Sequence, residues 1–346
     1  MRTSKINAIT ITYPEEIVFC FNRNVITITN VTDVITIKIE GNGKEFTDTA
    51  EPFEGIAQKD ISYYLQLLFE PLLDAAETGM SNISSQVSIT LSSPSLTGGW
   101  GETFTCIWGS LSPFDKFPQS YKQMTLPKNY ESVISVFYEG QEIWRSVDGG
   151  VPEKIFSGSV SLQSGIYNFI PDLSDAIREV KYMFGGTAQE VKNVFDTTFD
   201  YTFRKSAGME ADVTVKILID DCKDGIFLRW IDRQGHYNFF LLSQKNVSLK
   251  TENNGDKVSM EHSNFYNIMR QNKNENTTIN AYAHLANQYD FDNLTSLFTS
   301  PVAWLFVSDG QWIPVIVEPQ DNVNAGDSLQ DINMKISLPK SQIQYF

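Results

Sequence analysis

The chain has 346 residues, with 27 Lys and Arg against 42 Asp and Glu, so its formal net charge is −15. Hydrophobic residues make up 41% and charged residues 20%, which excludes a disordered chain and is compatible with a packed core. The acidic balance, with a pI near 4.7, speaks against nucleic acid or an anionic membrane as the main partner, because phosphate binding depends on Lys and Arg. This length predicts two domains, with three as the alternative, and needs no disulfide or metal to fold.

The N-terminus and the cysteines indicate the compartment. Residues 1–13 alternate Ile with Asn and Thr, which is not the continuous apolar run of a signal peptide. No stretch approaches the ~20 apolar residues that span a bilayer. Cys20, Cys106 and Cys222 are too far apart for a local metal cluster or a disulfide framework. We therefore expect synthesis in a reducing cytosol, no membrane insertion, and three cysteines buried as small apolar side chains.

Strand patterns dominate the first hundred residues. Ile, Val, Thr and Phe alternate over residues 8–13, 17–21, 25–29 and 34–39, and Gly41-Asn42-Gly43 favours a hairpin turn into residues 44–47. Asp60 is the expected N-cap of a helix that runs to Phe69 and is ended or kinked by Pro71. Strands resume at residues 86–91 and 103–108, with a loop between them.

The middle of the chain has weaker patterns. Residues 115–129 predict a long ordered loop or a change of layer, and residues 133–138 and 141–146 predict a hairpin that turns at Glu139-Gly140. Short strands are expected at 155–156, 160–162 and 165–170. Residues 172–184 have helical character and residues 188–195 suggest a further helix turn, before a strand at 198–204.

The clearest pattern is a predicted meander, with Val213, Val215, Ile217 and Ile219 on one face of its first strand. A turn at 220–224, a strand at 225–232, a turn at 233–235 and a strand at 236–243 follow. The Asn-rich tract at 253–280 predicts surface turns between short strands. A short helix capped near Asp290 is expected at 291–299, and strands at 302–307, 310–317 and 333–338.

These elements predict a mainly β fold of antiparallel β-sandwich-type domains with a few short helices. We place an N-terminal domain at residues 1–205, itself divisible into two, and a C-terminal domain at residues 206–346. The boundary is placed where helical and polar stretches give way to the meander.

No residue pattern identifies a reaction. His236, His262 and His284 lie in a hairpin turn or in polar tracts, where surface positions are favoured over a catalytic base or a zinc site. Residues 220–225 lack the alternating ligands and terminal Glu of a calcium loop, so a turn is favoured there over a cation site. Residues 98–101 lack the Lys-Ser/Thr of a phosphate loop. We therefore expect no catalytic residue, no metal site and no cofactor.

The aromatic residues are more informative: the chain has six Trp, 14 Tyr and 23 Phe. Core filling and cross-strand pairing are the favoured explanation. The alternatives are a stacking platform for sugar rings, or anchors in a protein–protein interface. Arg229 and Trp230 on one strand, with Trp304 and Trp312 on two adjacent strands, are the candidate interface or core anchors, and a core position is favoured for them.

Two stretches resemble a known family. Residues 225–242, GIFLRWIDRQGHYNFFLL, are similar to the pattern G-x-x-L-R-W-x-N-x-x-G-x-x-x-x-x-L-F of uncharacterised phage and prophage structural proteins, with Asp232 where Asn is expected. Residues 297–305, LFTSPVAWL, followed by GQWIPV at 310–315, resemble its second signature, T-S-P and then x-W-I-P-V. Residues 13–22 and 60–69 also fit the beginning of such proteins. The resemblance implies a component of a virion or its tail, with no catalytic residues attached to these motifs.

The leading hypothesis is therefore a non-enzymatic structural or assembly protein of a phage or prophage particle, associated with the tail. It would be made in the bacterial cytoplasm and act in the particle through contacts with other tail subunits or with its own copies. The alternative is a carbohydrate-binding or adhesive β-sandwich module that contacts a glycan at a cell surface. A hydrolase on a β scaffold is a third reading, because a fold does not decide function.

Overall fold

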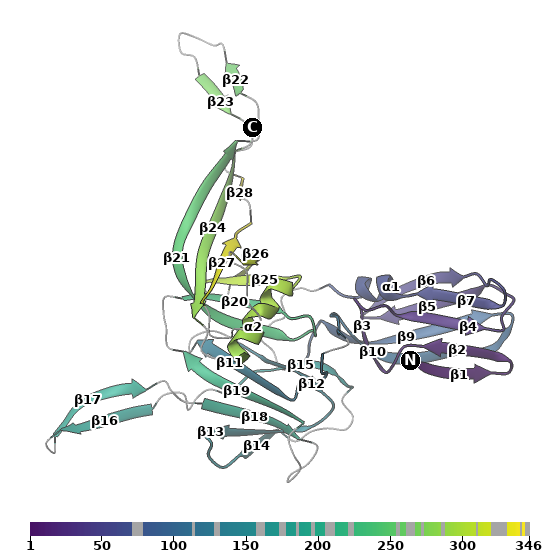
Figure 1. Cartoon of the computed structure of the whole chain (residues 1–346), viewed down its shortest axis with the longest axis horizontal. Coiled ribbons are helices and arrows are strands. Elements are labelled where there is room, and N and C mark those ends of the chain that lie inside the picture. The colour runs from purple at the N-terminus through teal and green to yellow at the C-terminus, as the bar shows by residue number, and fades with distance from the viewer. Residues whose placement is uncertain are drawn as a thin grey trace.

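The computed structural model describes residues 1–70, 79–112, 115–127, 132–156, 163–172, 178–184, 187–194, 198–204, 212–220, 225–253, 257–260, 267–270, 273–284, 288–308, 311–319, 331–339 and 341–342. The predicted mainly β class is confirmed, because these residues are mostly in antiparallel strands, with two short α-helices among them. Figure 1 shows an N-terminal double sheet set to one side, a central body, and a C-terminal sheet from which a long hairpin extends.

The N-terminal part is a β-sandwich. One sheet has the order β1-β2-β4-β7 and the other the order β3-β10-β9-β5-β6. Period-two alternation positions these strands, since Ile35, Ile37 and Ile39 of β5 are buried while the residues between them are half-buried. The strands are β1 (Arg2–Ile6), β2 (Ile9–Tyr13), β3 (Ile17–Phe19), β4 (Val25–Thr29), β5 (Ile35–Gly41), β6 (Lys44–Ala50), β7 (Ile56–Asp60), β9 (Ser84–Ser93) and β10 (Leu96–Ile107).

The predicted helix near residues 60–69 is present as α1 (Ser62–Leu67), but its cap differs by one residue. Ile61 occupies the N-cap position and makes no side-chain capping hydrogen bond. Asp60 Oδ1 instead accepts a hydrogen bond from the backbone N–H of Ser62 at 3.0 Å. The predicted loop at residues 92–101 is shorter than expected, because β9 and β10 continue into it through an irregularity between Leu96 and Trp100.

The central body contains two further sheets, in the orders β11-β19-β18-β13-β14 and β12-β15-β8. β11 and β19 pair in parallel, whereas the other pairs of these sheets are antiparallel. The strands are β8 (Gly79–Met80), β11 (Tyr121–Pro127), β12 (Ile134–Tyr138), β13 (Glu142–Val147), β14 (Glu153–Phe156), β15 (Gly165–Phe169), β18 (Thr198–Arg204) and β19 (Val213–Asp220).

Several pairing predictions in this body are wrong. The expected hairpin at 133–146 does not form, since β12 pairs with β15 and β13 pairs with β14 and β18. The expected loop at 115–129 contains strand β11. β19 pairs with β11 and β18, so the predicted meander is limited to its second hairpin. Local patterns indicate strands but not their partners, and the pairs β12–β15, β13–β18 and β11–β19 join segments that are far apart in the sequence.

The predicted domain boundary between residues 205 and 206 lies in sequence between β18 and β19, which are neighbours in the five-stranded sheet of this body; residues 205–211 themselves are outside the described residues. β18 ends at Arg204, and its antiparallel neighbour β19 begins at Val213. Both strands share buried faces, with Phe199, Tyr201 and Phe203 on one and Val215 and Ile217 on the other. The boundary therefore does not separate two sheets.

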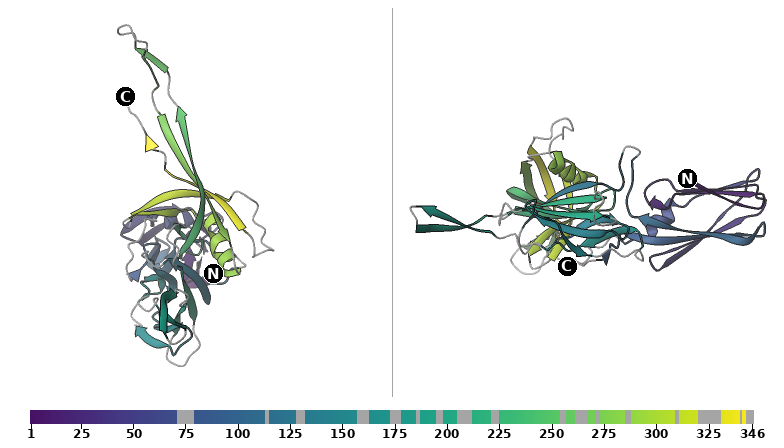
Figure 2. Two further views of the ribbon diagram at one scale, coloured as in Figure 1. Left: turned by 90° about the vertical axis from the view of Figure 1, so that its left-hand side faces the viewer. Right: turned by 90° about the horizontal axis from the view of Figure 1, so that it is seen from below.

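The helices expected within residues 172–195 are also wrong where the structure describes them. β16 (Arg178–Phe184) and β17 (Thr187–Val194) form an antiparallel pair, a sheet of their own that we call the 178–194 ribbon. Residues 173–177 and 195 lie outside the described residues. Figures 1 and 2 show this ribbon projecting from the body, on the side opposite the N-terminal sandwich.

The C-terminal sheet has the order β21-β20-β25-β26-β27-β24-β28 and closes on itself, because β21 also pairs with β24. β21 and β24 run on past this closure as the long hairpin, with the pair β22–β23 near its tip (Figure 1). The bounds are β20 (Gly225–Ile231), β21 (Tyr237–Asn253), β22 (Lys257–Met260), β23 (Asn267–Arg270), β24 (Lys273–His284), β25 (Ala303–Ser308), β26 (Gln311–Pro319), β27 (Asp331–Ser337) and β28 (Ser341–Gln342).

Helix α2 (Gln288–Thr299) confirms the helix expected at 291–299, with Asp290 in its first turn. Its apolar side, formed by Phe291, Leu294 and Leu297, packs in one core with the inner residues of the closed sheet, including Leu228 and Trp230. Spacings of three between these side chains place them on one side of the helix. The helix therefore has a fixed position beside the β20–β21 hairpin.

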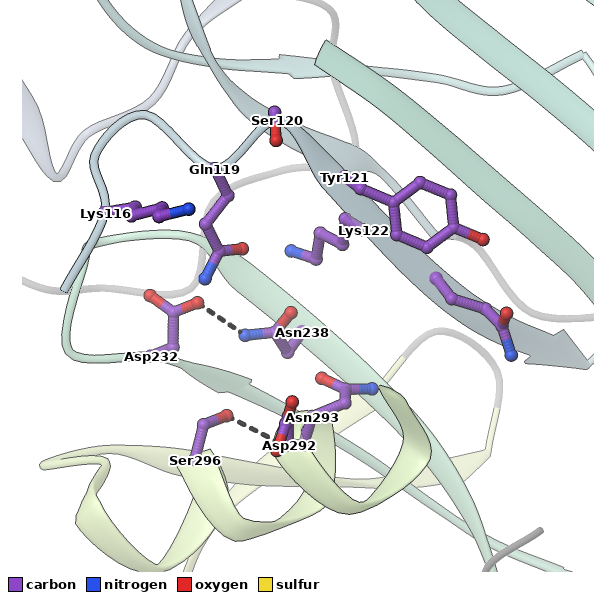
Figure 3. Close-up of a pocket in the computed structure, with 11 residues that line it drawn as sticks. Lys116, Gln119, Ser120, Tyr121, Lys122, Asp232, Asn238, Asp292, Asn293 and Ser296 are labelled. Atoms are coloured by element: carbon purple, nitrogen blue, oxygen red, sulfur yellow. Dashed lines mark hydrogen bonds between the residues drawn. The ribbon is translucent and has the colours of Figure 1, made fainter. Parts of the chain in front are cut away.

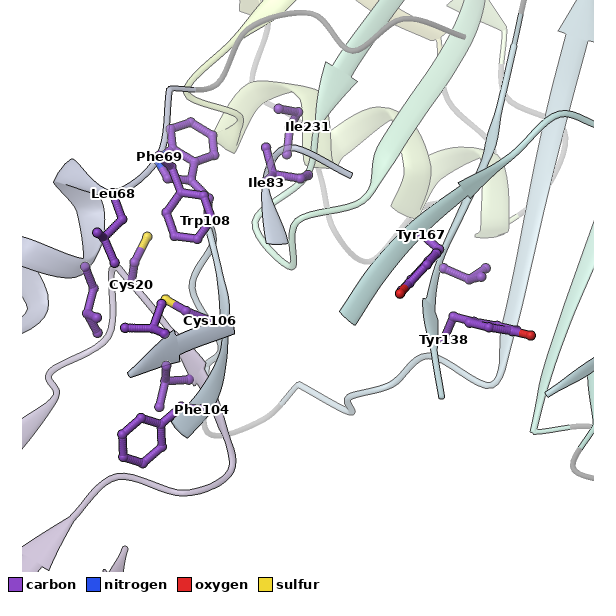
Figure 4. Close-up of a cluster of buried hydrophobic side chains, with 14 of the residues drawn as sticks. Cys20, Leu68, Phe69, Ile83, Phe104, Cys106, Trp108, Tyr138, Tyr167 and Ile231 are labelled. Carbon is purple, nitrogen blue, oxygen red and sulfur yellow. The ribbon is translucent and has the colours of Figure 1, made fainter. Parts of the chain in front are cut away.

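A larger apolar core runs through the N-terminal sandwich and the central body. Figure 4 shows Cys20, Leu68, Phe69, Cys106 and Trp108 gathered where the sandwich meets the body. Cys20 and Cys106 are fully buried and free, as expected. Burial raises the pKa of the Cys20 thiol to about 12, so the thiol stays protonated and acts as an apolar side chain. Cys222 lies outside the described residues.

Candidate functional site

The four candidate anchors all lie in or against the core. Trp230 is 0% exposed, Arg229 is 3% exposed and Trp304 is 7% exposed. Trp312 is half-buried and packs against the rings of Phe227 and Phe306. Arg229 and Trp304 are paired residues of the neighbouring strands β20 and β25. The structure thus brings these anchors onto three adjacent strands and presents none of them as an exposed anchor.

β20 is buried on both faces, which explains how an arginine and a tryptophan on it are both covered. Trp230 faces the interior of the closed sheet and donates its indole N–H to Ser296 Oγ of α2 at 2.9 Å. Arg229 points to the other side, where its guanidinium lies 4.0 Å from the ring centroid of Tyr237 and 5.6 Å from that of Phe239. Such cation–π stacking favours a desolvated Arg over Lys.

The turn between β20 and β21 is organised by one carboxylate, that of Asp232. Its Oδ1 accepts hydrogen bonds from the backbone N–H groups of Gln234 and His236, each at 2.9 Å, and its Oδ2 accepts one from Asn238 Nδ2 at 2.9 Å. These bonds fold the five residues of the turn around the carboxylate. A carboxylate can accept all three, whereas an Asn side chain at this position would offer only one acceptor oxygen.

Two basic side chains face this carboxylate. His236 Nδ1 lies 3.5 Å from Asp232 Oδ1, and Lys122 of β11 donates from Nζ to the backbone oxygen of Tyr237 at 3.1 Å. Burial by itself would raise the pKa of Asp232, but the charges of His236 and Lys122 and the hydrogen bonds to the carboxylate hold it well below its ordinary value. Burial lowers the pKa of Lys122 to about 8, against the opposing effect of Asp232.

His236 corrects a prediction. A surface position was expected because the residue lies next to a polar turn, yet His236 is only 3% exposed. The Asp232 hydrogen bonds draw the turn inward, and Phe117 covers the imidazole, with ring centroids 6.2 Å apart. The side chains of His262 and His284 are not among the described ones.

The segment after β10 is fastened to this turn. Arg233 Nη2 donates to Asp115 Oδ1, and Gln234 Nε2 donates to the backbone oxygen of Lys116 at 3.3 Å. Gly109 also approaches the turn so closely that an added Cβ would lie 2.4 Å from the Arg233 oxygen. These contacts place residues 115–123 opposite α2, with the turn between them.

A polar groove lies between residues 115–123, the turn and α2 (Figure 3). It consists of two adjoining hollows of about 290 and 520 Å³, which share Lys116, Gln119, Asp232, Asp292 and Ser296. Figure 3 shows Gln119, Lys122, Asp232 and Asn238 facing one another, with Asp292, Asn293 and Ser296 along the helix side. We call this feature the polar groove.

Sequence reasoning did not find the polar groove. Its residues come from segments more than 50 positions apart, and none forms a motif with its neighbours. The one available signal was the polar side of α2, because Asp292, Asn293 and Ser296 lie between the apolar residues of the helix in the sequence. A helix face that simply contacts solvent gives the same pattern, so this signal does not identify a site.

Among the described residues, no group of three or more His, Cys, Asp or Glu side chains is arranged to hold a metal ion. The turn predicted at 220–225 lies largely outside those residues. No helix in the described part of the chain is long and apolar enough to cross a membrane.

Comparison with known protein families and with curated proteins finds no family model and no curated protein that matches this chain.

Proposed function

We propose that the chain is a non-enzymatic structural protein of a phage or prophage particle, associated with the tail, that acts through protein–protein contacts. It would be made in the bacterial cytoplasm and function in the particle, with other tail subunits or further copies of itself as partners. The sequence resemblance at residues 225–242 and 297–315 supports this role. The β-rich architecture with projecting hairpins is compatible with it (Figure 2).

The observation on which the assembly role chiefly depends is the 178–194 ribbon. β16 and β17 pair only with each other among the described strands. An isolated two-stranded hairpin is marginally stable in water, and it gains stability when a further strand or another surface covers it. Projecting strand pairs of this kind can add to the sheet of a neighbouring molecule, with backbone hydrogen bonds supplying the contact.

A strand edge in the central body supports the same role. β14 (Glu153–Phe156) is the outermost strand of its sheet, and all four of its residues are exposed. Ile155 and Phe156 are 47% and 40% exposed, and Val151 just before the strand is 92% exposed. An exposed edge strand with apolar side chains is a template for pairing with another chain.

The glycan alternative loses the feature on which it was based. All six Trp residues are among the described ones; four are buried, and Trp144 and Trp312 are half-buried. A tryptophan platform for sugar rings needs an exposed indole face, so this version of the alternative has no support from the side chains.

The test compares the full chain with a variant in which Arg178–Val194 is replaced by a short Gly/Ser linker. Light scattering coupled to size-exclusion chromatography measures molar mass across protein concentration, and electron microscopy looks for ordered assemblies. We expect the full chain to associate and the variant to stay monomeric, with an unchanged melting temperature because the ribbon shares no sheet with the body. The same Gly/Ser linker inserted at Asn42-Gly43 is the control, and it should leave association intact.

Location in a particle needs a second measurement. Antibody labelling of particles released by the source bacterium should mark the tail under the electron microscope. A monomer at every concentration that is also missing from purified particles would contradict the proposal. So would turnover of a generic ester or glycoside that a single carboxylate substitution abolishes.

A further inference from the structure

The polar groove has the volume of a small-molecule site and is open to solvent on one side. Its two hollows, of about 290 and 520 Å³, meet at shared residues and lie in the range of roughly 300–1,000 Å³ typical of small-molecule sites. Its floor is the Asp232 turn, which the carboxylate holds rigid through three hydrogen bonds. A rigid floor reduces the entropy lost when a ligand binds.

The charges of the groove favour a ligand without net charge. Lys116, Lys122 and Arg233 are matched by Asp115, Asp232 and Asp292 among the lining residues. Arg233 is already paired with Asp115. The formal charge of −15 on the chain repels an approaching anion, and the two lysines in the groove repel a cation.

The hydrogen-bonding groups of the groove are mixed. Carboxylates accept, lysine ammonium groups donate, and the amides of Gln119, Asn238 and Asn293 do both. Adjacent hydroxyl groups of a sugar each donate and accept, so they match such a lining. A ligand with only acceptors or only donors would leave part of the lining unsatisfied.

One buried atom in the wall has no partner. Gln234 is 5% exposed and lines the larger hollow, and its Oε1 has no hydrogen-bond partner among the described residues. An unsatisfied buried acceptor costs free energy, but this oxygen is itself covered, so a ligand reaches it only if the Gln234 side chain changes its rotamer. Tyr121, 36% exposed at the rim, adds an aromatic ring of the kind that packs against the apolar face of a sugar.

We propose that the polar groove binds a neutral saccharide, with at least one sugar ring seated between Gln119, the Asp232 turn and the polar side of α2. This site is independent of the assembly role, because none of its residues belongs to the 178–194 ribbon or to β14. Saccharide binding and association can therefore succeed or fail separately.

The test begins with the full chain on an array of neutral glycans built from glucose, galactose, mannose and N-acetylhexosamines, with sialylated and phosphorylated glycans on the same array. A bound neutral glycan is then titrated by calorimetry. We expect Asp292→Ala and Gln119→Ala each to weaken binding at least tenfold. Both side chains are exposed in the groove, so the fold should persist. Glu51→Ala and Gln58→Ala, exposed in the N-terminal sandwich, are the matched controls and should bind normally.

A second readout locates the binding. The indole N–H of Trp230 donates to Ser296 Oγ, and Ser296 lines the groove. The NMR signal of the Trp230 indole N–H should therefore shift on titration with the same glycan. The proposal is overturned if no neutral glycan binds, if only anionic glycans bind, or if binding leaves this signal and the affinities of both groove variants unchanged. These outcomes test saccharide binding alone, because they do not depend on whether the chain associates with other copies of itself.

Discussion

Asp232 determines the local structure of the β20–β21 turn more than any other residue. Its carboxylate is almost fully buried, accepts three hydrogen bonds and lies near two basic side chains. A buried carboxylate is tolerated only where such partners replace its hydration. The same residue forms the floor of the polar groove, so a side chain that stabilises the fold also shapes the candidate site.

Replacing Asp232 should therefore cost far more than replacing an exposed acid. We expect Asp232→Ala to lower the free energy of unfolding by about 3–5 kcal/mol, because it leaves the buried His236 and the half-buried Lys122 without the carboxylate. Urea denaturation followed by circular dichroism measures the change. Glu153→Ala, at the exposed edge strand β14, should stay within about 0.5 kcal/mol of the unchanged chain. Equal effects of the two substitutions would show that the turn does not depend on this carboxylate.

Asp48 makes stability depend on pH in acid. Hydrogen bonds from Lys59 and from the Tyr64 hydroxyl lower the pKa of Asp48 from 3.8 to about 2, against the effect of burial. Because the folded-state pKa is the lower one, this group stabilises the fold above pH 3.8, and the contribution is lost as the pH falls from 3.8 to about 2. A shift of this size corresponds to about 2.5 kcal/mol at most.

Removing the ionisable group should flatten that dependence. We expect the stability of Asp48→Asn to change less than that of the unchanged chain between pH 4 and pH 2, in urea titrations at each pH. Asp200→Asn is the control. It leaves Asp48 and its partners unchanged, so its stability should keep the acid dependence of the unchanged chain. Parallel pH profiles for the Asp48 variant and the unchanged chain would contradict this role.

At the scale of elements, local chemistry fixes where strands turn, and packing decides which strands meet. The β20–β21 hairpin was predictable because its turn residues Arg233-Gln234-Gly235 separate two apolar runs. The ribbon at β16–β17 was predicted as helix, since its sequence also contains good helix formers such as Glu, Lys and Ala. A short segment with mixed preferences takes the structure that its pairing allows.

Gly235 illustrates how a turn and its tertiary surroundings combine. Its φ is +81°, and an added Cβ would lie 2.5 Å from Ile107 Cγ2 at the end of β10. Gly43 has a similar φ of +73°, with nothing within 4 Å of an added Cβ. Gly43→Ala should therefore cost about 1 to 2 kcal/mol from backbone strain alone. Gly235→Ala should cost more, because Ile107 must also move.

Thermal unfolding of the two alanine variants measures this difference. The melting temperature of Gly235→Ala should fall further than that of Gly43→Ala, and an Ile107→Ala, Gly235→Ala double variant should recover part of the excess relative to Ile107→Ala alone. Equal losses for both glycines would mean that the contact with β10 is not tight. The comparison separates the backbone conformation of the turn from its packing against the sandwich.

For the whole molecule, net charge governs how copies approach one another. A formal charge of −15 makes two copies repel, and raising the salt concentration from 10 to 100 mM shortens the Debye length from about 30 to about 10 Å. We expect the second virial coefficient from static light scattering at pH 7 to fall over this interval and association to strengthen. The same measurement near pH 4.7, where the net charge vanishes, should show little dependence on salt. Association that weakens with salt at pH 7 would instead indicate contact between oppositely charged surfaces.

The sequence by itself determined the mainly β class, most strand positions, both described helices and the burial of Cys20 and Cys106. These follow from periodicity and turn residues, which act over a few positions. Only the tertiary structure decided the parallel pairing of β11 with β19, the closure of β21 on β24, the burial of His236 and the existence of the polar groove. Each of these depends on residues far apart in the chain, and their meeting is set by packing of whole sheets, for which no local pattern exists.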